Sequence, residues 1–148
     1  MNPWDIRTVL LARHAQHVVL IHFPIALFIV GVALDAVASF TRRKDVAAAA
    51  YYNLCLAALA AVPAALTGVL AWQWELEGKR LKGILLLHLL LGCASVVLIL
   101  GTWWVHRRGR PGREEPLPRL RWVVEVLGVV LVGLTGHLGG FLSGVNHP

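Results

Sequence analysis

Four long apolar stretches, separated by short polar connectors, are the clearest pattern in the chain. They cover about residues 18–40, 46–74, 84–105 and 122–142. At about 1.5 Å per residue, each stretch is long enough as a helix to cross roughly 30 Å of membrane hydrocarbon. Apolar residues occupy all sides of each stretch, as expected for helices in contact with lipid. The pattern therefore predicts four transmembrane helices.

The connectors, residues 41–45, 75–83 and 106–121, are short. Short connectors join antiparallel neighbours in helix bundles. We therefore expect an all-α membrane protein in which residues 1–148 form one domain, a four-helix up-down bundle. Pro24 and Pro63 lie inside the first and second stretches, where the missing backbone donor favours a bend.

Composition agrees with this placement in a membrane. Hydrophobic residues make up 57% of the chain and charged residues 15%, compared with about 45–50% and about 25% in soluble domains. The formal net charge of +6 would suit a nucleic-acid partner, but the basic residues lie in connectors and no nucleic-acid motif accompanies them. We expect the lipid bilayer, and no nucleic acid, as the surroundings of the chain.

The distribution of Lys and Arg predicts the orientation, because cytoplasmic loops are enriched in both. The first and third connectors carry nine, namely Arg42, Arg43, Lys44, Arg107, Arg108, Arg110, Arg113, Arg119 and Arg121. The opposite side carries five, namely Arg7, Arg13, Lys79, Arg80 and Lys82. We therefore expect both termini on the outer side of the membrane. Residues 1–5 lack a basic segment, so we expect no cleaved signal peptide.

Three histidines lie inside the apolar stretches at a shared depth. His22, His88 and His137 belong to the first, third and fourth stretches, and the up-down topology brings each to about 7–9 Å below the outer hydrocarbon boundary. Small residues lie on the helical face of each histidine, namely Ala26 and Ala33 for His22, then Gly92, Ser95 and Thr102 for His88, then Gly133, Gly140 and Gly144 for His137. Such stripes let helices approach closely, and they also leave room for a flat ligand.

Imidazole is the usual axial ligand of haem iron and a common ligand of other metals. Two of His22, His88 and His137 could therefore hold one haem b iron, with the pair unresolved and the third histidine bonding a propionate or a quinone. The alternative is that each histidine is neutral and hydrogen-bonds a neighbouring helix without any cofactor. Because ionisable residues inside membranes are costly and mark functional sites, we favour a bound haem or metal.

Two acidic residues and a further histidine lie near the inner ends of the stretches. We expect Asp35 to pair with Arg42 or Arg43, and Glu125 to pair with Arg121 one helical turn away. His106, beside Arg107, is expected to contact solvent or lipid headgroups. No hydrolytic constellation is present, so an electron-transfer subunit fits the sequence better than a stand-alone enzyme.

Three segments resemble a known family. They are residues 17–27 (HVVLIHFPIAL), 86–90 (LLHLL) and 136–142 (GHLGGFL). In this order they are similar to the domain-of-unknown-function 2231 family of bacterial four-helix membrane proteins. Val18 departs from the proline usual after the first histidine, and residues 142–145 depart from the usual continuation of the Gly-Gly motif.

Members of that family are often joined to cytochrome c or Rieske iron–sulfur domains. The resemblance therefore implies electron transfer in a bacterial inner membrane, where the outer side predicted for both termini is the periplasm. It implies a cytochrome c, a Rieske-type redox protein or larger membrane-complex subunits as partners. Its matching functional candidates are His17, His22, His88 and His137.

These observations lead to one main hypothesis and two others. The main hypothesis is a b-type cytochrome or a haem-bearing subunit of a respiratory or photosynthetic complex, with haem in the outer half of the bundle. The second is a non-catalytic accessory or scaffold subunit of a membrane redox complex. The third is a metal-ion handling membrane protein, with His14, His17 and His22 as an entry path.

Overall fold

The computed structural model describes residues 13–74, 80–113 and 116–144, with side chains in the first range described from residue 16 to residue 73. This part of the chain contains the helices α2 (Arg13–Thr41), α3 (Lys44–Trp74), α4 (Gly83–His106) and α5 (Arg121–Leu142), and no strand. All four helices are long and apolar enough to cross a membrane. The predicted all-α four-helix membrane fold is therefore confirmed.

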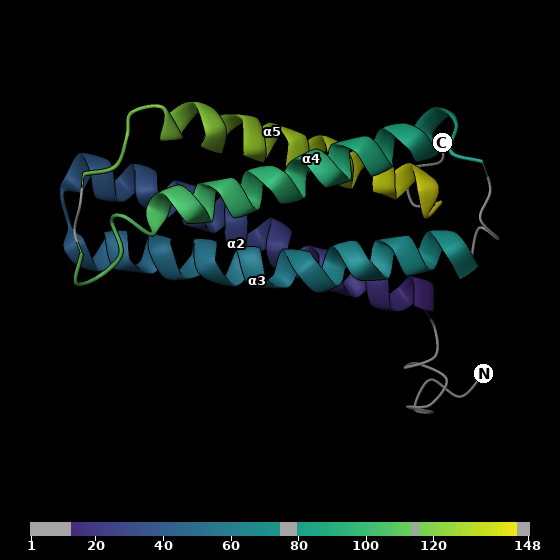
Figure 1. Ribbon diagram of the computed structural model, residues 1–148, viewed down its shortest axis with the longest axis horizontal. Coiled ribbons are helices and arrows are strands. Elements are labelled where there is room, and N and C mark those ends of the chain that lie inside the picture. The colour runs from purple at the N-terminus through teal and green to yellow at the C-terminus, as the bar shows by residue number, and fades with distance from the viewer. Residues whose placement is uncertain (1–12, 75–79, 114–115, 145–148) are drawn as a thin grey trace.

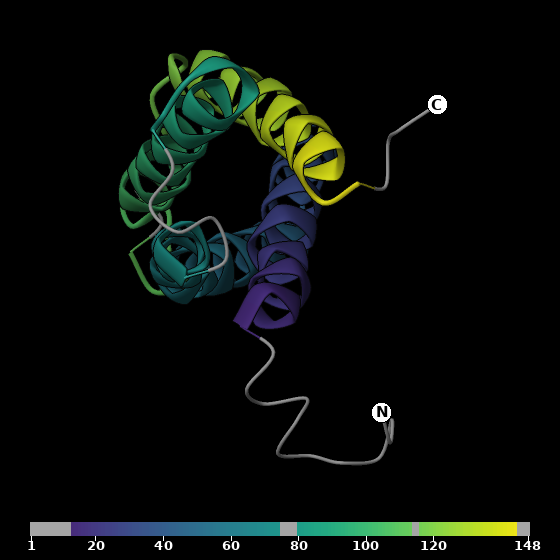
Figure 2. The same ribbon diagram turned by 90° about the vertical axis from the view of Figure 1, so that its right-hand side faces the viewer.

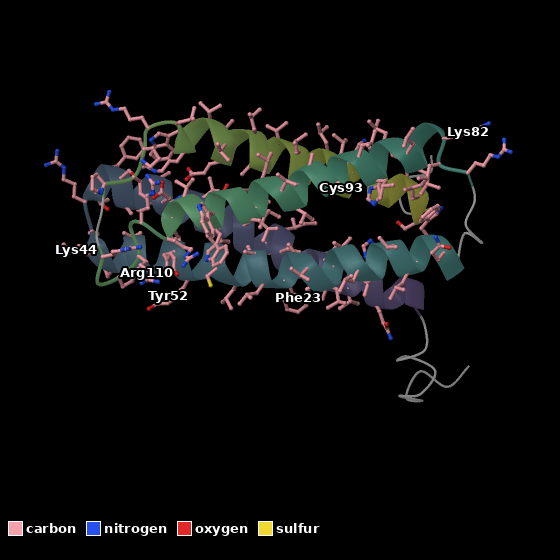
Figure 3. All side chains as sticks on the ribbon, in the orientation of Figure 1. Phe23, Lys44, Tyr52, Lys82, Cys93 and Arg110 are labelled. Atoms are coloured by element: carbon pink, nitrogen blue, oxygen red, sulfur yellow. The ribbon has the colours of Figure 1, made fainter. Side chains whose placement is uncertain are left out.

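The helices alternate in direction along the bundle. The start of α2, the end of α3, the start of α4 and the end of α5 lie together, at the right of Figure 1. Viewed from that end, the helices follow one another around the bundle in the order α2, α3, α4, α5 (Figure 2). Lys44 and Arg110 lie at the opposite end from Lys82 (Figure 3). We call the end with Lys44 and Arg110 the arginine-rich end.

The bundle is most closely packed within two helix pairs, which also contact each other through α3 and α4. α2 packs extensively on α3, and α4 packs on α5, whereas α2 and α5 touch little. Only Arg42 and Arg43 separate α2 from α3, and Arg42 makes the reversal with a positive φ of 55°. Such a short connector forces the two helices to be antiparallel neighbours.

Small residues make the α2–α3 contact close. The buried side of α3 is mostly alanine, formed by Ala50, Leu54, Ala57, Ala58, Ala61 and Ala64. On α2, a Cβ at Gly31 would lie 2.9 Å from the Leu54 side chain. Small residues let membrane helices approach closely and gain van der Waals contact. Many large apolar side chains point outward, as lipid-facing helices require.

Candidate functional site

His88 lies half-buried between α4 and α5. Its Nδ1 is 3.1 Å from the carbonyl oxygen of Thr135. A carbonyl can only accept, so Nδ1 carries the proton and the lone pair of the neutral ring is on Nε2. The ring rests beside Gly139, where a Cβ would lie 3.3 Å from His88 Cε1. The first glycine of the Gly-Gly motif therefore makes room for this histidine.

A hydroxyl pair continues the polar contact between α4 and α5. The Thr135 hydroxyl donates to the carbonyl oxygen of Leu131, at 2.7 Å. Because the Thr135 proton is used in that bond, Thr135 Oγ1 can only accept from Ser95. Ser95 Oγ therefore donates to Thr135 Oγ1, at 3.2 Å. Together with His88, these side chains fix how α4 and α5 align along the membrane.

His17 makes a similar contact between α2 and α3. Its Nδ1 lies 3.1 Å from Thr67 Oγ1, and the Thr67 hydroxyl donates to the carbonyl oxygen of Pro63 or Ala64 at 2.9 or 3.0 Å. His17 is therefore the donor through Nδ1, as His88 is. A Cβ at Gly68 would lie 3.0 Å from His17 Cε1. His17 and His88 thus each rest against a glycine.

The other two predicted ligands are exposed on the isolated chain. His22 Nδ1 donates to the carbonyl oxygen of Val18, one turn earlier on α2, at 2.6 Å. His137 contacts the ring of Phe141 edge-on, with centroids 5.0 Å apart. His22 and His88 both bond backbone carbonyls through Nδ1. An imidazole pair around one iron stays a prediction. The side chain of His14 lies outside the described residues.

A second polar group lies inside the bundle near the arginine-rich end. His106 Nε2 is 2.8 Å from Glu125 Oε1, and Arg121 Nε is 2.9 Å from Asp35 Oδ2. Arg121 also donates from Nη2 to Ser39 Oγ at 2.8 Å. Asp35, His106 and Glu125 are only 4%, 3% and 0% exposed. The group joins α2, α4 and α5.

These contacts correct three expectations. Asp35 pairs with Arg121 rather than with Arg42 or Arg43, and Glu125 pairs with His106 rather than with Arg121. His106 is buried and does not contact solvent. The expectations were based on nearness in sequence, whereas packing of α5 against α2 and α4 selects partners from other helices. The available signal was depth, because these residues all lie near the ends of their stretches closest to the arginine-rich connectors.

The atoms of this group that could bind a metal ion lie close together. One ligand-type atom from each of Asp35, His106 and Glu125 lies within 4.8 Å of the others. Among the described residues, Glu125 Oε2 and Thr102 Oγ1 are buried without a hydrogen-bond partner. A cleft of about 580 Å³ reaches Asp35 and Arg121 from the side of the third connector. Chemically, the arrangement can hold a cation or a proton.

Comparison with known proteins gives one match, to a family model. The family is described as "Predicted membrane protein (DUF2231)", and its model matches residues 13–146. No curated protein and no solved structure matches the chain. The matched range contains all four helices and both groups of polar residues. The chain therefore belongs to this family of multi-pass membrane proteins, domain of unknown function 2231.

Proposed function

We propose that this membrane protein binds an imidazole-liganded redox cofactor, haem b foremost, in the half of the bundle away from the arginine-rich end. In this proposal it transfers electrons in a bacterial inner membrane, with both termini periplasmic. Its partner would be a cytochrome c, a Rieske-type protein or a larger complex. A quinone is a further candidate ligand.

One observation carries the proposal. His22 and His88 each donate Nδ1–H to a backbone carbonyl, at 2.6 and 3.1 Å. Metal-bound histidines usually donate their other ring nitrogen in this way, which fixes the ring and leaves Nε2 to coordinate the metal. The two residues thus have the tautomer that an iron ligand needs. A bound haem would supply a one-electron iron couple.

The visible spectrum of the purified protein tests the proposal. We expect a Soret band, and a sharp α-band on reduction, after expression with sufficient haem. Replacing the two ligating residues among His22, His88 and His137 by alanine should remove or shift these bands, and the same change at His17 tests the fourth candidate. His106→Gln, at the other end of the bundle, is the matched control and should leave them unchanged. Absence of a Soret band, or its survival in the His22, His88 and His137 triple variant, would refute haem binding.

A second candidate function is an accessory subunit without a cofactor. It is favoured by the contacts of His17 with Thr67 and of His88 with Thr135, since both join neighbouring helices. In that case His88→Ala should destabilise a colourless protein that purifies with a larger pigmented complex. Metal-ion handling would instead be indicated by bound copper or zinc that is lost when His17 and His22 are replaced, which elemental analysis measures.

A further inference from the structure

We propose that Asp35, His106 and Glu125 form a binding site for a divalent transition-metal cation of the zinc, manganese or iron(II) class. The site lies near the arginine-rich end, apart from the histidines of the proposed redox function. It uses one residue from each of α2, α4 and α5. Two carboxylates and one imidazole are the mixed oxygen and nitrogen donors that these ions accept.

The spacing of the donors fits an ion of this size. Ligands of one zinc ion lie about 2.0–2.2 Å from the metal, so two ligands are about 3.4 Å apart in a tetrahedron and at most about 4.4 Å apart. The donor atoms here all lie within 4.8 Å of one another, so a movement of at most about 0.4 Å brings every pair to 4.4 Å or less. The distance between His106 Nε2 and Glu125 Oε1 is 2.8 Å and needs to open by about 0.6 Å. A bound ion would replace the proton between these two atoms and release it to solvent.

The charges of the group favour a cation. Asp35 and Glu125 supply two carboxylates. The guanidinium of Arg121 pairs with the Asp35 carboxylate. With a neutral His106, these three groups carry a net charge of −1 inside the bundle, where an uncompensated charge is costly, and the nearby cleft wall adds one residue of each sign, Lys44 and Asp45. A divalent ion changes the net charge of Asp35, Glu125 and Arg121 from −1 to +1, which favours movement of the guanidinium away from Asp35. Since Arg121 also bonds Ser39 and lines the cleft, we expect its guanidinium to keep Ser39 and turn toward the cleft.

The unpartnered oxygen of Glu125 points independently to a ligand. Glu125 is 0% exposed, and its Oε2 has no hydrogen-bond partner among the described residues. Oε2 belongs to the same carboxyl group as the oxygen that contacts His106, so it lies within the group. Thr102, one helical turn before His106, is 2% exposed and also has an unpartnered hydroxyl oxygen. Buried polar atoms normally have partners, and an ion or its bound water would satisfy these.

The cleft gives an ion access from the arginine-rich end. Asp35 and Arg121 are in its wall, together with Asp45 at the start of α3 and residues of the third connector such as Gly109 and Pro111. An ion can therefore reach Asp35 without crossing the lipid-facing surface of the helices.

Zinc binding to the purified, detergent-solubilised full chain tests the site. The protein is stripped with a chelator, exposed to a small excess of Zn²⁺, desalted and analysed for bound zinc. We expect about one zinc per chain, and a loss of affinity of more than about tenfold in Glu125→Gln, because removing even the supporting groups of a metal site costs 10–100-fold. His106→Gln should behave alike. The triple change of His22, His88 and His137 to glutamine is the control and should retain the zinc.

A second measurement guards against variants that fail to fold. Co²⁺ bound by wild-type protein gives visible absorption that reports nitrogen and oxygen ligation, and addition of Zn²⁺ should remove it. Thr102→Val keeps all three ligands and should weaken zinc binding less than Glu125→Gln does. Lack of zinc and cobalt binding by folded wild-type protein would overturn the proposal and leave a proton on His106 as the compensating charge. Zinc retained by Glu125→Gln and His106→Gln would overturn it as well. Neither result depends on whether haem is present.

Discussion

Gly128 of α5 is the position where a single methyl group should do the most damage to packing. A Cβ there would lie 2.6 Å from Phe28 Cζ and 2.8 Å from Cε1. Phe28 of α2 is 0% exposed, so its ring has no free space to enter. This contact joins two helices that otherwise touch little. Gly128→Ala should therefore force α2 and α5 apart.

The size of the effect follows from two opposing terms. Ordinary contacts of a Cβ begin at 3.4 Å, so the distance between the added Cβ and the Phe28 ring must increase by at least about 0.8 Å. Overpacking of this kind costs about 1–3 kcal/mol. Alanine in a helix gains about 0.5–1 kcal/mol over glycine. Gly133→Ala, on the same helix with nothing within 4 Å of its Cβ, has the second term alone. The free energy of unfolding should therefore be about 1–3 kcal/mol lower for Gly128→Ala than for Gly133→Ala.

Unfolding in mixed detergent, followed by circular dichroism, measures this difference. A double-mutant cycle with Phe28→Leu should show coupling, because the smaller side chain removes the clash. Equal stability of Gly128→Ala and Gly133→Ala, within about 0.5 kcal/mol, would show that the Phe28–Gly128 contact is not made as described.

Two further predictions concern the polar groups. Arg121→Gln leaves the buried Asp35 carboxylate without its ion pair and should lower the free energy of unfolding by about 3–5 kcal/mol, measured by the same detergent unfolding. Gly139→Ala places a Cβ 3.3 Å from the His88 ring, so the ring must yield by a few tenths of an ångström. We expect a changed ¹⁵N shift of His88 Nδ1 with a stability change under about 1 kcal/mol.

Each of these has a matched control. Arg119 is exposed two residues before the start of α5, and Arg119→Gln should change stability by less than about 0.5 kcal/mol. Gly136→Ala adds a Cβ with nothing within 4 Å and should leave the His88 signal in place. If Arg121→Gln is as stable as Arg119→Gln, the ion pair of Asp35 with Arg121 contributes nothing to the free energy of unfolding. An unchanged His88 signal in Gly139→Ala would show that this glycine does not support the ring.

Much of the fold is determined by the sequence alone. A bilayer offers no water to bond backbone groups, so long apolar stretches must form helices that satisfy their own hydrogen bonds. Four such stretches with short connectors then leave an up-down bundle as the simple solution. The resemblance carried by residues 17–27 and 136–142 also identified the family, because those motifs are local in sequence.

Partner choice, in contrast, was decided by the tertiary structure. Within one helix, neighbours three or four residues apart can be read from the sequence, and on that basis Glu125 pairs with Arg121. In the bundle, α5 packs against the end of α4, so Glu125 meets His106, and Arg121 is left for Asp35 of α2. The tautomer of His88 is likewise set by a carbonyl on another helix. Spacing along one helix contains no information about which residues of a second helix will face it, and side-chain packing between helices supplies that choice.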